Sequence, residues 1–129
     1  MFKPKDYNSL SAYLIVDQAD DLVEQLKTIF EAVELRRFLH ENGKIAHLEL
    51  KIDDTVLMIS NSTEQFAATQ TTLHLYVADA FKTFNLAIAN GCTLVEEPTS
   101  RPNDPDLRGS FLDMSGNFWA VSTQNQEQS

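Results

Sequence analysis

The same order of short patterns occurs twice along the chain, and this repetition constrains the fold more than any other feature. In the first half, residues 12–16 form an apolar run and residues 22–30 carry apolar side chains at helical spacing. Three runs typical of strands follow at 33–38, 45–52 and 55–60, the last two joined across an Asp-Asp turn. This half therefore predicts a strand, a helix and three further strands.

The second half repeats this order from residue 72 onwards. A strand is predicted at 72–77, and a helix follows that begins after Asp79 and ends at Asn90-Gly91, a pair typical of helix C-termini. Asp17 or Asp20 is expected to cap the helix of the first half in the same way. The remaining strands of the second half are expected at 92–96, 110–114 and 117–122, with a proline-rich loop at 97–109.

The two hairpins match without a gap, since IDDTVLMIS at 52–60 aligns with MSGNFWAVS at 114–122. One such half is too small to bury its apolar face alone. The sequence therefore predicts an α+β fold in which module 10–62 and module 70–123 form a single domain spanning residues 1–129.

Alternation within the strands predicts two different sheet faces. In the first strand, Leu14 and Val16 share an aliphatic face that is expected to pack on the helix, whereas Tyr13 and Ile15 share the other. The second face is mixed in every strand, which suits a cavity wall, although an ordinary half-exposed face is the alternative. The candidate ligand-binding residues are Tyr13, His47, Glu49, Met58, His74, Tyr76, Arg108, Phe111 and Phe118.

Charge and cysteine content exclude several kinds of protein. The net charge of −9 disfavours nucleic acid and anionic membranes as partners, because phosphate binding requires a basic surface. The single cysteine, Cys92, excludes an intramolecular disulfide and a cysteine-based zinc cluster. No apolar run is long enough for a membrane helix, and we expect a cytoplasmic protein.

Several stretches resemble the vicinal oxygen chelate superfamily, which includes glyoxalase I, bleomycin-resistance proteins, fosfomycin-resistance enzymes and extradiol dioxygenases. AYLIVDQADDLVEQLKTIFEAVELRR is similar to the opening of the glyoxalase-like group, although Glu31 replaces the usual glycine. GKIAHLELKIDDTVLMISN is similar to its first hairpin, and LRGSFLDMSGNFWAVST to its closing signature, in which Met114-Ser115 stands where a proline is usual. The resemblance covers residues 10–123.

The resemblance implies an open, U-shaped sheet of eight strands around a concave pocket, with helices on the outer face, in a chain that forms a homodimer. It also implies a divalent metal held by four side chains of the concave face. These positions fall on Ser11, Met58, Thr72 and Ala120. Two hydroxyls, a thioether and a methyl group are poor ligands for a hard divalent ion, so no metal cofactor is predicted.

Two alternatives remain open for the site. A shift of two residues would make His74 a ligand, and His47, Glu49 and His74 would then form a displaced metal site or an acid–base pair, with Glu49 and His74 as candidate catalytic residues. Arg108 would either grip an acidic ligand or form a brace with Asp104, Asp106 or Asp113.

Three functions are compatible with these residues. The first is a small-molecule binding protein of the bleomycin-resistance type that lacks the metal. The second is a metal-dependent lyase, isomerase or dioxygenase with a displaced site. The third is a dimeric interaction domain with a vestigial pocket.

Overall fold

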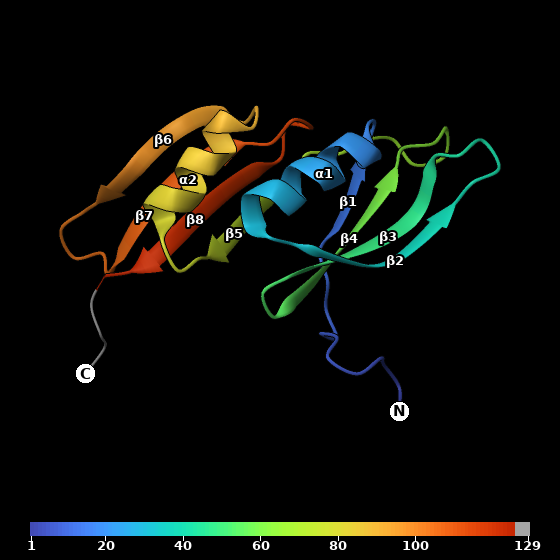
Figure 1. Ribbon diagram of the computed structural model, residues 1–129, viewed down its shortest axis with the longest axis horizontal. Coiled ribbons are helices and arrows are strands. Elements are labelled where there is room, and N and C mark those ends of the chain that lie inside the picture. The colour runs from blue at the N-terminus through green and yellow to red at the C-terminus, as the bar shows by residue number, and fades with distance from the viewer. Residues whose placement is uncertain (126–129) are drawn as a thin grey trace. The chain divides into compact units, whose positions relative to one another are not determined.

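A computed structural model describes residues 1–125 of the chain. The chain divides into two compact units, Met1–Thr69 and a second unit that begins at Gln70. Each unit contains one helix and one four-stranded sheet (Figure 1).

The first unit has the predicted order of elements. Its elements are β1 (Tyr13–Val16), α1 (Ala19–Phe30), β2 (Val33–Leu39), β3 (Ile45–Ile52) and β4 (Thr55–Asn61). The strand order in the sheet is β1-β4-β3-β2, with β1 parallel to β4 and the other neighbours antiparallel. β2 is therefore an edge strand, and β4 lies in the middle of the sheet.

The second unit repeats this arrangement. Its elements are β5 (Thr72–Tyr76), α2 (Ala80–Ala89), β6 (Thr93–Ser100), β7 (Asp106–Leu112) and β8 (Phe118–Gln124). The strand order is β5-β8-β7-β6, again with one parallel pair, β5 and β8. The predicted α+β class and the repeated strand–helix–strand–strand–strand module are confirmed. The joining of both modules in one domain around a shared pocket stays a prediction.

In the first unit, the aliphatic face of the sheet packs on α1 as the alternation predicts. Leu14, Val16, Leu48 and Ile59 are fully or almost fully buried, as are Leu22 and Leu26 on the facing side of the helix. Tyr13 points to the opposite side of the sheet and keeps 43% of its surface exposed. The opposite face of this sheet is therefore free to hold a site.

The helix ends follow the sequence signals only in part. Asp79 caps α2, and its side chain accepts a hydrogen bond from the Lys82 amide at 3.1 Å. The prediction that Asp17 or Asp20 caps α1 is wrong, because Gln18 is the N-cap and makes no capping bond with its side chain. The two carboxylates bind other partners, namely the Ser62 hydroxyl and the Arg37 guanidinium, respectively.

The C-terminus of α1 accounts for an unusual residue in the sequence. Glu31 follows the helix in the left-handed conformation, with φ of 55°. Glycine adopts this conformation without strain, which fits the glycine that the resembling proteins carry here.

The proline-rich segment 97–109 is mostly strand and not the predicted loop. β6 continues to Ser100 and β7 begins at Asp106, so only a short turn separates them. Pro98 is tolerated because β6 is the edge strand of its sheet, where a missing backbone N–H breaks no ladder on the open side. Gly109 completes the fit, since a Cβ there would lie 3.0 Å from the Pro98 ring.

The closing signature builds the turn between β7 and β8 around the buried side chains of Asp113 and Asn117. The Asp113 carboxylate accepts hydrogen bonds from the Ser115 amide at 2.9 Å, the Asn117 amide at 3.0 Å and the Trp119 indole at 2.8 Å. Asn117 in turn accepts a bond from the Thr71 amide, which ties the turn to the start of β5. The signature therefore has a structural role in this chain.

Candidate functional site

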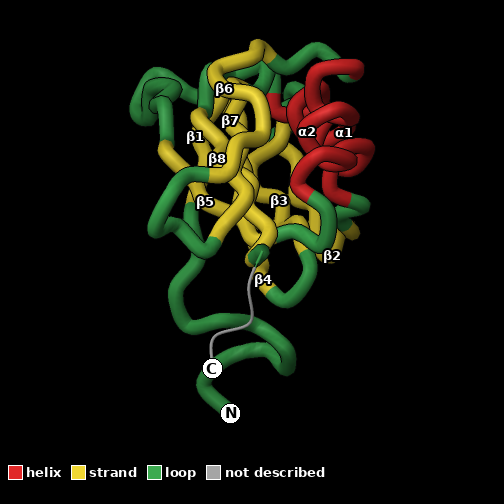
Figure 2. Tube along the Cα trace, turned by 90° about the vertical axis from the view of Figure 1, so that its left-hand side faces the viewer, coloured by secondary structure: helices red, strands yellow, loops and turns green. Residues whose placement is uncertain are grey.

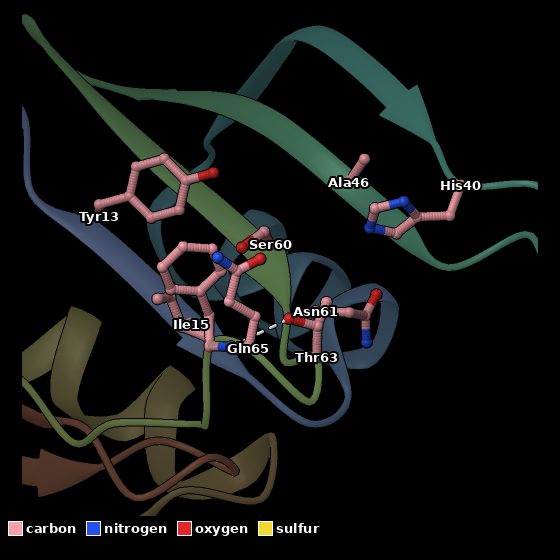
Figure 3. A pocket seen from close by; sticks show the side chains of 9 residues that line it. Tyr13, Ile15, His40, Ala46, Ser60, Asn61, Thr63 and Gln65 are labelled. Atoms are coloured by element: carbon pink, nitrogen blue, oxygen red, sulfur yellow. Dashed lines mark hydrogen bonds between the residues drawn. The ribbon is translucent and has the colours of Figure 1, made fainter.

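A cavity of about 390 Å³ opens on the first sheet, on the face away from α1. Three elements supply most of its wall: β1, β4 and the loop that follows β4. Figure 3 shows Tyr13 entering from β1 and His40 from the end of β2, with Ser60 of β4 between them. The lining residues are Tyr13, Ile15, His40, Ala46, Ser60, Asn61, Thr63, Gln65 and Phe66.

Local backbone features place two of these side chains. The register between β2 and β3 shifts next to Ala46, so that Ile45 stays in the core while Ala46 lines the cavity. The loop carrying Phe66 is closed by two hydrogen bonds between Phe66 and Thr63, and the Thr69 amide attaches it to the Ile15 carbonyl at 3.0 Å. The wall is therefore held by backbone hydrogen bonds and is preformed.

A chain of polar side chains begins at the cavity and runs across the sheet. The Tyr13 hydroxyl lies 3.1 Å from His47 Nδ1, and His47 Nε2 lies 3.0 Å from Glu49 Oε2. Glu49 is only 5% exposed, although it faces away from the helix. The sequence predicted these three residues on one face, and the structure brings them into direct contact.

The N-terminal segment explains why Glu49 is buried. This segment precedes β1 as a long loop (Figure 2). Its Tyr7 hydroxyl donates to Glu49 Oε1 at 2.5 Å, and Asn8 accepts a hydrogen bond from the Val56 amide at the neighbouring strand. Arg36 lies 3.6 Å from the same Glu49 oxygen, with its guanidinium 5.5 Å from the centre of the Tyr7 ring.

These contacts decide the charge of Glu49. Burial opposes ionisation and raises the pKa of this carboxyl, but the hydrogen bonds from Tyr7 and His47 and the positive charge of Arg36 outweigh it. The pKa of Glu49 is therefore lower than the ordinary value of 4.5. The hydrogen bond to Glu49 also raises the pKa of the Tyr7 phenol.

Stability at low pH is expected to depend on Glu49. A carboxyl whose pKa is lower in the folded state stabilises the protein above its unfolded value of 4.5, and this stabilisation is lost as pH falls through the folded pKa. We expect Glu49→Gln to lower the free energy of unfolding by about 2 kcal/mol at neutral pH. The difference from wild type should shrink at about pH 3. Urea unfolding at both pH values measures it.

The exposed Glu64 supplies the matched control for this measurement. We expect Glu64→Gln to leave the free energy of unfolding within about 0.5 kcal/mol of wild type at both pH values. An equal loss for Glu49→Gln at neutral and acidic pH would show that the carboxylate charge contributes nothing.

A second polar cluster lies on the sheet of the second unit. His74 Nε2 lies 2.9 Å from the Ser122 hydroxyl, which also accepts a bond from Arg108 Nε at 3.1 Å. The Tyr76 hydroxyl donates to Asp106 at 2.7 Å, and this bond raises the pKa of the phenol. Arg108 also pairs with Asp104 at 3.0 Å and with Asp106 at 3.5 Å. Of the two roles considered for Arg108, these contacts form the brace.

The aromatic candidates of the last hairpin lie on opposite faces. Phe111 is fully buried, and its ring centre lies 6.3 Å from that of Phe84 in α2. It is paired with Trp119, so both side chains belong to the helix-facing core. The expectation that Phe111 lines a ligand site is therefore wrong. Phe118 is half-buried and lies one residue out of phase with this core.

The donor atoms at the superfamily's metal positions do not fit a divalent ion. Strand pairing places the Met58 thioether next to Tyr13 and Glu49, and the Ala120 methyl next to His74 and Ser110. The other two positions hold hydroxyls, with Ser11 half-buried and Thr72 exposed next to Phe118. None of these four side chains offers a nitrogen or carboxylate ligand.

The displaced metal site also lacks support in its donor atoms. Both Glu49 oxygens already accept bonds or ion pairs, from Tyr7, Arg36 and His47. Within residues 1–125, no three His, Cys, Asp or Glu side chains form a group suited to a metal ion.

Sequence reasoning missed Tyr7, His40 and Phe66. Tyr7 and Phe66 lie in segments without periodic apolar residues, where no pattern predicts which face a side chain meets. A lone large aromatic within the polar loop STEQFAATQ was the available signal for Phe66. His40 follows β2 in the turn to β3, where strand alternation predicts no face for a side chain.

Comparison with other proteins identifies relatives without an assigned activity. No protein-family model matches the chain. An uncharacterized protein of Mycobacterium bovis, Mb0911c, is 28% identical over 130 residues, which cover 92% of this chain and 85% of that protein.

Comparison with solved structures identifies the fold. TioX from Micromonospora sp. ML1 superposes with a TM-score of 0.73 at 19% identity, over 95% of this chain and all of that one. The fosfomycin resistance protein FosX from Listeria monocytogenes gives 0.70 at 14% identity, over 90% and 92% of the two chains. The chain has the vicinal oxygen chelate fold. TnmS3, an antibiotic binding protein from Streptomyces sp. CB03234, shares this fold with a TM-score of 0.68 at 15% identity, over 91% and 97%.

The vicinal oxygen chelate fold confirms the resemblance seen in the sequence at the level of architecture. Identities below one fifth carry no activity from one member to another, because one fold supports many functions. In the part of the chain that the structure describes, neither helix is long and apolar enough to cross a membrane.

Proposed function

We propose that this chain binds a small planar organic molecule in the cavity of its first unit, without the divalent metal of its superfamily. The observation that carries the proposal is the preformed cavity of about 390 Å³ with the rings of Tyr13, His40 and Phe66 in its wall. This volume is typical of small-molecule sites, and aromatic rings stack on planar ligands. The shared fold of FosX and TnmS3 is consistent with it.

The two other functions have less support. A metal-dependent lyase, isomerase or dioxygenase would need free nitrogen or carboxylate ligands, whereas Glu49 is engaged by three neighbours. An interaction domain with a vestigial pocket would not require polar side chains to be positioned at the pocket wall, as Tyr13 is. The proposal includes a homodimer, which is supported by exposed apolar side chains on the edge strand β2, namely Val33, Leu35, Phe38 and Leu39. It also includes a cytoplasmic location, which is supported by the free thiol of Cys92.

Filling the cavity tests the proposal. We expect Ala46→Phe to place a ring in the cavity and to abolish the binding of planar compounds that stabilise the wild-type protein. A thermal-shift screen of planar aromatic compounds, followed by ligand-detected NMR on the hits, provides the measurement.

The matched control is Ala89→Phe, which adds the same ring at an exposed position of α2. We expect this variant to bind the hits as the wild type does. The proposal fails if no planar compound binds the wild-type protein, or if hits bind Ala46→Phe with unchanged affinity.

A further inference from the structure

The two hydrogen bonds that link Tyr13, His47 and Glu49 run in the same direction, from Tyr13 towards Glu49. Glu49 is ionised at neutral pH and can only accept hydrogen bonds, so His47 Nε2 must carry the hydrogen at the 3.0 Å contact. In the neutral imidazole, Nδ1 is then the acceptor and takes the hydrogen of the Tyr13 hydroxyl at 3.1 Å. The three side chains therefore form a relay that leads protons from the cavity wall towards a buried carboxylate.

The neighbours of the His47 imidazole are one carboxylate and two aromatic rings. Glu49 is the charged group in direct contact with the imidazole, and its negative charge is shared with Arg36 and Tyr7 on its other oxygen. The other ring neighbours of His47 are the uncharged Phe38 at 6.3 Å and Tyr13 at 5.6 Å between centres. In this arrangement the carboxylate orients the histidine, so that its other ring nitrogen faces the Tyr13 hydroxyl.

We propose that the cavity selects planar aromatic compounds with an acidic hydroxyl group and binds them as their anions, with His47 accepting the proton through Tyr13. This inference rests on the proposed function, because it names the ligand class of the same cavity. Tyr13 alone of the three lines the cavity, so the ligand meets its hydroxyl and not the imidazole.

The proton transfer balances without any further reactant. The O–H bond of the ligand breaks and its proton passes to the Tyr13 oxygen, while the hydrogen of Tyr13 passes to His47 Nδ1. The products are a ligand oxyanion that accepts a hydrogen bond from neutral Tyr13, and an imidazolium held by Glu49. One positive and one negative charge form together, and the net charge of the complex does not change.

A pair of probes that differ in one proton tests the inference. At about pH 7, free 3-nitrophenol is mostly neutral, and its phenolate absorbs at a longer wavelength. We expect the wild-type protein to bind it with the absorbance of the phenolate. 3-Nitroanisole has the same ring but no proton to give, and it should bind about tenfold more weakly.

Two variants separate the relay from simple packing. His47→Gln retains hydrogen-bonding groups but cannot accept a proton, so the bound probe should lose the phenolate absorbance. Tyr13→Phe removes the hydroxyl and keeps the ring, and it carries the same test if His47→Gln fails to fold. His74→Gln removes an imidazole that does not line the cavity and binds Ser122 on the second sheet, so this variant should still bind the probe with the phenolate absorbance.

The outcomes distinguish this inference from the proposed function. If both probes bind the wild-type protein equally and 3-nitrophenol stays neutral, the relay is overturned while the cavity remains a binding site. Phenolate absorbance that persists in both His47→Gln and Tyr13→Phe overturns the relay as well. If neither probe binds, the inference fails, and the cavity-filling experiment judges the proposed function separately.

Discussion

Replacing Asp113 with alanine is expected to lower the free energy of unfolding by about 4 kcal/mol. Asp113 is 4% exposed, and its carboxylate accepts bonds from two backbone amides, the Asn117 side chain and the Trp119 indole. Without the carboxylate, these donors lose their hydrogen-bond partner at a buried position. Urea unfolding followed by tryptophan fluorescence measures the effect at the site itself.

The repeat supplies a control for this prediction. The equivalent turn of the first unit carries Asp54, which is exposed and bonds only the adjacent Thr55 hydroxyl. Asp54→Ala should change the free energy of unfolding by no more than about 0.5 kcal/mol. Equal losses in the two variants would contradict a buried hydrogen-bond centre at Asp113.

Phe111→Ala is the second change with a large expected effect. Its ring is fully buried between the sheet and Phe84, so truncation leaves a cavity in the core and should cost about 4 kcal/mol. Phe118→Ala, on the opposite face of the same hairpin, should cost about 1 kcal/mol because Phe118 is only half-buried. Thermal or urea unfolding of the pair measures the difference.

Binding measurements complete this comparison. Phe111→Ala should bind planar probes as the wild type does under conditions where it remains folded, because the ring lies outside the cavity wall. If Phe111→Ala remains as stable as the wild type but no longer binds the probe, Phe111 does contribute to ligand binding.

The repetition in the sequence was sufficient to predict the order of elements and the helix-facing residues. In a short strand such as β1, the aliphatic residues Leu14 and Val16 indicate the buried side, because side chains alternate between the two faces of a sheet. The prediction of a loop at 97–109 was wrong because proline is rare in strands in general, whereas an edge strand tolerates it. The prediction for Phe111 was wrong because it rested on the aromatic residue type, whereas pairing with Trp119 places this ring in the core.

The sequence was sufficient to predict the site residues that lie on strands, but not those that lie in irregular segments. Tyr13, His47 and Glu49 share one face through strand alternation, which sequence reasoning can follow. The burial of Glu49 depends on Tyr7, and the cavity wall depends on Phe66, both in irregular segments. Contacts made by such segments arise from tertiary packing, for which a single sequence offers no periodic signal.

The pairing register shows that the two copies of the repeat have diverged in chemistry. Glu49 pairs with Met58, and at the equivalent place in the second copy Ser110 pairs with Ala120, while Tyr13 corresponds to His74. One copy thus buries a carboxylate at the middle of its sheet, whereas the other buries Asp106 at the start of β7 and Asp113 at the turn. The two modules are therefore not interchangeable, because a chimera of two first modules would carry the relay twice and would lack the Asp113 turn.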